Sequence, residues 1–209
     1  MLRRFRIRKP QELKSLARFY LSNVASLVTF NSLVKSLKMS ASTVEKFSGY
    51  LEQAYLVFFL KRFSFKVREQ EKSPRKTYSI DTGLSNAVGF RFSENVGRLA
   101  ENVVFLELKR QQALNAGLEL YYWKDVHHRE VDFVLKDGLK VKQLIQVCWN
   151  VDDFRTKERE LRSLKKAMAE LKCKHALVVT EEYEAEETLN GSPVRFVSLW
   201  KWLLDPKTW

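Results

Sequence analysis

Apolar and polar residues alternate along three neighbouring stretches in the second half of the chain, at residues 121–124, 130–135 and 144–148. Alternation with a period of two is typical of a β-strand that buries one face. The stretches therefore predict two or three strands of one sheet. Asp132 and Gln146 fall on neighbouring strands, so their side chains are expected to meet on one face of that sheet.

A carboxylate beside an amide oxygen forms part of a ligand set for a hard cation such as Mg²⁺. Asp132 and Gln146 are therefore the first candidates for a chemical site. Two interpretations without a chemical role compete with this one. A buried aspartate is often held by structural partners, and a glutamine on a sheet often bonds only to its neighbours.

The first third of the chain predicts three short helices. Residues 11–23 carry the apolar stripe of an amphipathic helix. Thr29 can cap a helix over 30–37, and Ser40 or Ser42 can cap one that ends near residue 53. Two helices, a tight turn and a third helix form a helix-turn-helix pattern.

Two strands, at residues 55–65 and 77–80, are predicted to follow, joined by a charged loop over 66–76. Together with the helices they predict a winged helix over residues 1–90. Three side chains would face outward from the recognition helix: Ser42, Thr43 and Lys46. Five cations would lie on the wing: Lys66, Arg68, Lys72, Arg75 and Lys76. This surface could contact DNA, or the module could serve protein docking.

Residues 91–209 predict a second domain. A long helix from Glu94 to about residue 115 precedes the three strands, with Glu101 among its apolar positions. A helix to about residue 171, a strand over 176–180, an acidic loop or short helix over 181–190, a strand over 194–197 and a closing helix over 199–204 follow. The fold class is thus α/β (α+β), a mixed sheet flanked by helices.

The amino-acid composition and the absence of certain motifs argue against several classes of protein. The 209 residues are 45% hydrophobic and include two cysteines. There is no apolar run long enough for a membrane span, no signal-peptide pattern and no P-loop for nucleotide. We expect a cytoplasmic protein that has no membrane partner and binds no nucleotide through this chain.

The net charge of +12 is concentrated at one end of the chain. Residues 1–90 hold 17 Lys and Arg against 6 Asp and Glu, whereas the rest of the chain is nearly balanced. A localised positive field favours a polyanionic partner, most often nucleic acid.

Several motifs in order resemble a known family. They are Lys76-Thr-Tyr-Ser-Ile-Asp-Thr-Gly-Leu84, Gly97-Arg-Leu-Ala-Glu-Asn-Val-Val-Phe-Leu-Glu-Leu108, Tyr121-Tyr-Trp-Lys124 and Glu130-Val-Asp-Phe-Val134. From about Gln11 onward the chain resembles the C-terminal region of bacterial and archaeal AAA-type ATPases with a DUF4143-type domain. The resemblance implies a fragment or stand-alone relative whose partner is an AAA-type ATPase domain, fused or separate.

The resemblance also implies a PD-(D/E)xK nuclease-like fold for residues 91–209. By resemblance the catalytic residues fall on Glu101, Asp132 and Gln146. Asp132, the Gln146 oxygen and the Val147 carbonyl would hold Mg²⁺, which would polarise a phosphodiester and activate a water.

The chain departs from the family pattern where a lysine is expected, because Cys148 stands there. A neutral thiol supplies no positive charge at a phosphate. Lys142, Lys157 and His128 are candidate replacements. Instead of a catalytic role, Glu101 could have a structural one as an acid paired with Arg98 or Lys109.

Three functions stay open. The first is a nucleic-acid-binding module of an ATPase with weakened or lost cleavage. The second is a Mg²⁺-dependent DNA endonuclease with a displaced lysine. The third is a protein-docking regulatory domain.

Overall fold

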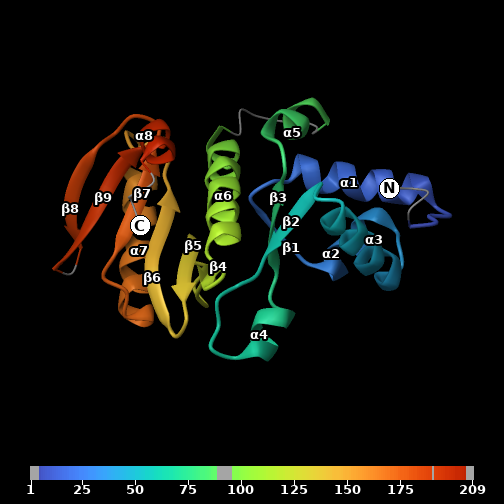
Figure 1. Ribbon diagram of the computed structural model, residues 1–209, viewed down its shortest axis with the longest axis horizontal. Coiled ribbons are helices and arrows are strands. Elements are labelled where there is room, and N and C mark those ends of the chain that lie inside the picture. Colours follow the sequence, from blue (N-terminus) through green and yellow to red (C-terminus); the bar gives the residue numbers. More distant parts are fainter. Residues whose placement is uncertain (1–4, 89–95, 190, 206–209) are drawn as a thin grey trace. The chain divides into compact units, whose positions relative to one another are not determined.

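A computed structural model describes residues 5–88, 96–189 and 191–205 (Figure 1). The chain divides into two compact units. The N-terminal unit comprises residues 1–61 and 71–102, and the C-terminal unit comprises residues 62–70 and 103–209. Helix α6 (Val96–Leu114) belongs to both, since the division falls after Asn102.

The N-terminal unit is built on three helices, α1 (Pro10–Ser22), α2 (Phe30–Leu37) and α3 (Ala41–Gln53). Local chemistry sets their ends. Thr29 caps α2 by accepting the Ser32 N–H at 3.1 Å, and Ser40 caps α3 by accepting the Thr43 N–H at 3.2 Å. Both expected caps are therefore confirmed.

A three-stranded antiparallel sheet completes the unit, in the order β1-β3-β2. Its strands are β1 (Ser26–Val28), β2 (Val57–Leu60) and β3 (Arg75–Ser79). The helix α5 (Thr82–Val88) follows β3. The core lies between the helices and this sheet, and its fully buried side chains include Leu16, Leu33, Val44, Leu51 and Val57.

The structure corrects several predicted boundaries in this region. The strand expected over 55–65 is confined to β2, and the short strand β1 was not predicted. The segment expected to be a loop over 66–76 contains the helix α4 (Val67–Lys72) and the first residues of β3. Because Lys76 lies within β3, it is not part of a loop.

The C-terminal unit holds a six-stranded mixed sheet in the order β4-β5-β6-β7-β9-β8. The strands β4 (Leu118–Lys124), β5 (Glu130–Asp137) and β6 (Lys140–Val147) are antiparallel neighbours. The helix α7 (Phe154–Leu171) crosses over to β7 (Ala176–Thr180), which is parallel to β6. The mixed α/β class is confirmed.

The last strands differ from the prediction. Residues 185–189, expected in an acidic loop or short helix, form the edge strand β8 (Ala185–Leu189), while residue 190 lies outside the described residues. Strand β8 pairs antiparallel with β9 (Ser192–Ser198), and β9 is parallel to β7. The chain then enters α8 (Leu199–Leu204).

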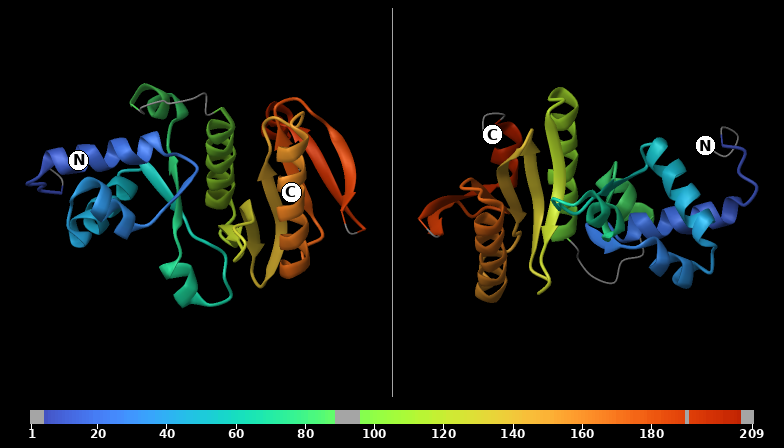
Figure 2. Two further views of the ribbon diagram at one scale, coloured as in Figure 1. Left: turned by 180° about the vertical axis from the view of Figure 1, so that it is seen from behind. Right: turned by 90° about the horizontal axis from the view of Figure 1, so that it is seen from below.

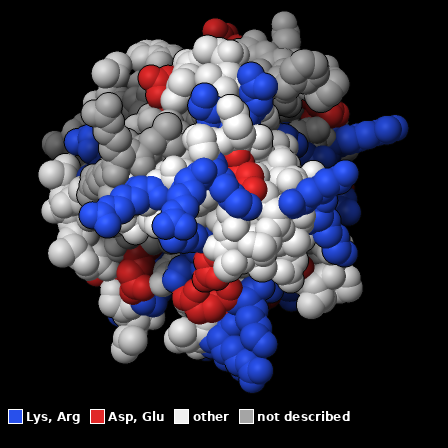
Figure 3. Space-filling model, turned by 90° about the vertical axis from the view of Figure 1, so that its right-hand side faces the viewer, with Lys and Arg blue, Asp and Glu red and all other residues white. Residues whose placement is uncertain are grey.

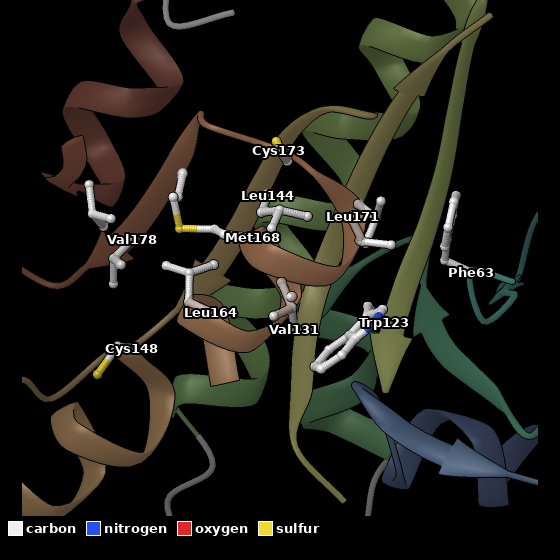
Figure 4. Close-up of a cluster of buried hydrophobic side chains, with 14 of the residues drawn as sticks. Phe63, Trp123, Val131, Leu144, Cys148, Leu164, Met168, Leu171, Cys173 and Val178 are labelled. Atoms are coloured by element: carbon white, nitrogen blue, oxygen red, sulfur yellow. The ribbon is translucent and has the colours of Figure 1, made fainter. Parts of the chain in front are cut away.

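The two faces of this sheet carry different helices. Helix α7 packs against β5 and β6 (Figure 2). Leu164, Met168 and Leu171 of α7 belong to one buried cluster with Val131 and Leu144 of those strands (Figure 4). On the other face, Phe105 of α6 contacts Phe133 of β5, with ring centroids 6.5 Å apart. In the parts of the chain that the structure describes, no helix is long and apolar enough to cross a membrane.

Candidate functional site

Asp132 and Gln146 meet on neighbouring strands, as the alternation predicts. The Gln146 Oε1 accepts a hydrogen bond from the Asp132 backbone N–H at 3.2 Å, and the Asp132 Oδ2 accepts one from the Val147 N–H at 2.9 Å. The side chains are 6% and 4% exposed, respectively. Each side chain therefore bonds to the backbone of the opposite strand, and both point toward the α7 face.

Glu160 of α7 adds a second carboxylate to this pair. Its Oε2 accepts a hydrogen bond from Gln146 Nε2 at 2.7 Å. Its Oε1 is held by Arg159, whose Nε and Nη2 lie at 3.1 and 2.6 Å. A chain of polar contacts thus runs from Asp132 inside the sheet to an arginine whose side chain is 70% exposed.

Neither Glu160 nor Arg159 was predicted as a site residue. A signal for Glu160 was nevertheless present in the sequence. It lies four residues before Leu164 and seven before Ala167, so it falls on the buried stripe of α7. An acid on an apolar stripe requires a partner, because an unpaired carboxylate is costly to bury.

Cys148 occupies the position at which the family pattern expects lysine. Its side chain is 3% exposed, and its Sγ lies 3.7 Å from the Asn150 carbonyl oxygen. Burial raises the pKa of the Cys148 thiol to about 11, and the negative charge of Glu160 adds to the effect. The group is neutral near pH 7 and supplies no positive charge.

Two of the three replacements considered for that lysine, Lys142 and Lys157, have other partners. Lys142 forms an ion pair with Asp137 at 3.6 Å, and Lys157 forms one with Glu187 of β8. His128 lies exposed in the turn before β5, with a φ of 63°.

The set formed by Asp132, Gln146 and Val147 does not fit Mg²⁺ as the sequence predicted it. The Asp132 Oδ2 already accepts a hydrogen bond from the Val147 N–H. The amide oxygen of Gln146 already accepts a hydrogen bond, and its NH₂ group donates to Glu160. Among the described residues, no three His, Cys, Asp or Glu side chains gather in a metal-binding group. The amide NH₂ of Gln146 and the guanidinium of Arg159 already bond to the Glu160 carboxylate, so that carboxylate has partners without a metal ion.

Glu101 lies at the start of α6, within the N-terminal unit. Its Oε1 accepts a hydrogen bond from Lys76 Nζ at 3.0 Å and another from the Tyr78 hydroxyl at 2.7 Å. The ion-pair partner in β3 replaces the two considered from the sequence, Arg98 and Lys109. The next residue, Asn102, brackets Ser79 through hydrogen bonds to its N–H at 2.8 Å and its carbonyl at 2.9 Å. Membership of Glu101 in a catalytic set stays a prediction.

The predicted position of Lys76 on an exposed wing is therefore wrong. The sequence placed it on an exposed wing, but its residue is 2% exposed and its ammonium is paired with Glu101. A buried, paired ammonium is not available to a phosphate in solution. Lys76 and Tyr78 are two residues apart on one strand, so the shared face was readable from the sequence.

The other predicted nucleic-acid contacts have mixed surroundings. Ser42 and Lys46 are exposed on α3, whereas Thr43 is half-buried and its Oγ1 lies 2.8 Å from the Ser40 hydroxyl. Arg75 is half-buried, pairs with Glu71 at 3.3 Å and stacks on Phe30 at 5.4 Å from the ring centroid. Two further cations, Lys66 and Arg68, are exposed.

Family comparisons agree with the motifs. A family model described as a domain of unknown function, DUF4143, matches residues 96–202. The chain belongs to the DUF4143 family. A second domain of unknown function, DUF8612, matches residues 1–95. The DUF4143 match begins at the first residue of α6 and contains Glu101, Asp132, Gln146 and Glu160.

Relatives of this DUF4143 protein occur in archaea and bacteria. An uncharacterized protein of Methanocaldococcus jannaschii, MJ1544, is 32% identical over 98% of this chain and 47% of its own length. An uncharacterized protein of Haemophilus influenzae is 24% identical over 90% of this chain and 45% of its own length. The chain thus spans about half the length of the curated relatives it matches. No solved structure matches it significantly.

Proposed function

We propose that this DUF4143 protein is a nucleic-acid-binding module of an AAA-type ATPase, and that its nuclease-like unit does not cleave. The observation that carries the proposal is the concentration of exposed cations on the helices of the N-terminal unit and on the segments next to them. Eight Lys or Arg between residues 5 and 53 are exposed: Arg6, Arg8, Lys9, Lys14, Arg18, Lys35, Lys38 and Lys46. The exposed acids over the same residues are Glu45 and Glu52.

One face of the protein carries more basic than acidic side chains. In Figure 3, blue basic side chains cross this face and clearly outnumber the red acidic ones. Phosphate contacts by Lys and Arg supply most of the sequence-independent affinity for nucleic acid, since each releases bound counterions. Such a face therefore favours a polyanion over an uncharged partner.

The order of elements in the N-terminal unit supports a winged-helix interpretation. Helix α1, strand β1, helices α2 and α3, strand β2, the short helix α4 and strand β3 follow one another, and the turn between α2 and α3 has Lys38 in a left-handed conformation at φ 52°. In a helix-turn-helix the second helix reads the groove with its N-terminal residues. Ser42 and Lys46 occupy that exposed part of α3.

The order of elements in the C-terminal unit supports a nuclease-like fold. A helix, three antiparallel strands, a crossover helix and a parallel strand correspond to α6, β4, β5, β6, α7 and β7, the order that the PD-(D/E)xK resemblance implies. Cleavage is not expected, because Cys148 is neutral and the Asp132 set does not fit a divalent cation. The length of the relatives is consistent with a further domain, and an AAA-type ATPase domain is the proposed partner.

Fluorescence anisotropy with a labelled DNA duplex at several salt concentrations tests the binding. The logarithm of the binding constant is expected to fall linearly with the logarithm of the salt concentration. Lys35→Gln/Lys46→Gln is expected to weaken binding more than the matched variant Lys140→Gln/Lys142→Gln, which removes two exposed cations of the β5–β6 hairpin. Absent or salt-independent binding would refute the proposal and favour protein docking.

Incubation of branched and linear DNA with Mg²⁺ or Mn²⁺ tests the cleavage. No products are expected from the unmodified protein. Metal-dependent products that disappear in Asp132→Ala would show an active endonuclease and overturn the non-cleaving part of the proposal.

A further inference from the structure

The C-terminal half of the chain is nearly neutral as a whole, but many of its cations and acids lie in different segments. Residues 155–174, which cover α7 and the turn after it, hold eight Lys or Arg and three Glu. Residues 181–187, at and before the edge strand β8, hold five Glu and no cation. Eight of the 20 Lys and Arg in residues 91–209 therefore lie along α7 and the turn after it.

Four of these cations form one row on the helix. Arg155, Arg159, Arg162 and Lys166 are spaced by four, three and four residues, and all four are exposed. At a rise of about 1.5 Å per residue, the row extends for about 16 Å. We call these four residues the α7 basic row.

The exposed face of an amphipathic helix usually carries both cations and acids, so the acids near the row must be compared with its four cations. Arg155 and Lys166 have no ion-pair partner among the described residues. Arg162 pairs with Glu158 at 2.7 Å, but both side chains are more than half exposed, so solvent screens the pair. The row thus keeps an excess of positive charge that its own helix does not neutralise.

The interior of the unit holds one member of the row in place. The two hydrogen bonds from Arg159 to Glu160 Oε1 orient its guanidinium, and Glu160 is in turn held by Gln146. Leu164, Ala167 and Met168 anchor the opposite side of the helix in the core (Figure 4). The backbone that carries the row is therefore fixed to the core, and Arg159 is oriented within the row.

We infer that the α7 basic row is a second nucleic-acid contact, which binds the phosphate backbone of one strand. Phosphates of duplex DNA repeat about every 3.4 Å along the axis of each strand, so the row matches a run of about five. An extended polyanion fits a linear row better than a compact acidic ligand does. This inference rests on the proposed nucleic-acid function but involves a different unit from the cations that carry it.

The test uses the full chain, a labelled duplex of about 20 base pairs and anisotropy across a salt series. Arg155→Gln/Arg162→Gln/Lys166→Gln removes three members of the row and spares Arg159, which has a structural contact. The matched control, Lys140→Gln/Lys142→Gln/Arg195→Gln, removes three exposed cations elsewhere in the same unit. Like the test variant, it breaks one exposed ion pair.

The row variant is expected to lose affinity about tenfold or more at moderate salt, with a salt slope shallower by about 2 to 3. The control and the charge-preserving variant Arg155→Lys/Arg162→Lys/Lys166→Arg are expected to bind much as the unmodified protein does. If the charge-preserving variant binds as poorly as the Gln variant, the effect is on folding and the inference is wrong.

Two further outcomes separate this inference from the proposed function. If the row variant and its control bind alike while Lys35→Gln/Lys46→Gln weakens binding, the α7 basic row is no contact and the proposed function survives. If the unmodified protein does not bind the duplex, both are overturned.

Discussion

Replacing Lys76 by methionine tests how strongly the buried ion pair stabilises the N-terminal unit. The Lys76 side chain is 2% exposed and that of Glu101 is 11% exposed. Methionine retains most of the lysine volume, so the cavity contribution is small and the loss of the charge dominates. Removing one partner of a buried pair typically costs about 3–5 kcal/mol, because the other charge stays buried without compensation.

The Tyr78 hydroxyl reduces that cost, since it donates to Glu101 at 2.7 Å and the substitution leaves this donor in place. We therefore expect Lys76→Met to lower the free energy of unfolding by about 3 kcal/mol, at the lower end of that range. In Lys76→Met/Glu101→Gln, the glutamine can accept from Tyr78 and neither member of the pair is charged. The double variant is expected to recover about 1–2 kcal/mol relative to Lys76→Met alone.

Urea unfolding followed by far-ultraviolet circular dichroism measures these changes. With an m-value of about 1–3 kcal/mol per molar urea, the midpoint should fall by about 1 M or more. All five tryptophans lie in the C-terminal unit, so tryptophan fluorescence reports that unit separately.

The exposed pair of Arg162 and Glu158 gives the control, because Arg162→Met should cost less than about 0.5 kcal/mol. Equal effects of Lys76→Met and Arg162→Met would refute the reasoning, as would additive losses in the double variant.

Three more predictions concern single side chains. Gln146→Glu places a second carboxylate beside Glu160, so the thermal midpoint should fall and Mn²⁺ should restore it in this variant alone. Stabilisation of the unmodified protein by Mn²⁺ would contradict the poor fit to a divalent cation. Cys148 has a pKa raised from 9.0 to about 11, so the folded state keeps the proton that the unfolded state releases. Stability should fall as pH rises from 9 to 11, and Cys148→Ala should remove this contribution in urea titrations at pH 8 and 10. Ser40→Ala removes the cap of α3 and should cost about 1 kcal/mol by thermal unfolding, whereas an unchanged midpoint would mean that the cap contributes nothing.

Residue patterns over a few neighbouring positions were sufficient to predict many of the helices and strands. Alternation placed Asp132 and Gln146 on one face of adjacent strands, because the register of an antiparallel pair follows from the pleat and the short turn that joins its strands. The caps Thr29 and Ser40 were readable because a capping side chain bonds to an N–H only three residues away.

Contacts between distant segments required the folded chain. Lys76 and Glu101 are separated by 25 positions, and nothing in the charge pattern near either residue indicates that they pair. The approach of Glu160 to Gln146 depends on where the crossover helix α7 packs against β5 and β6. Strand β1 was missed because three residues show no period, and β8 because Ala-Glu-Glu-Thr-Leu holds few of the residue types that favour strands.

Residue order alone thus settled the mixed α/β class, the three-helix start and the strand pair that carries Asp132 and Gln146, since each depends on neighbours along the chain. Tertiary packing decided that Lys76 is buried against Glu101 and that Glu160 bonds to Gln146. The physical reason is that burial and pairing of a charge depend on which segments the core brings together, and the same lysine or glutamate in the sequence is compatible with either outcome.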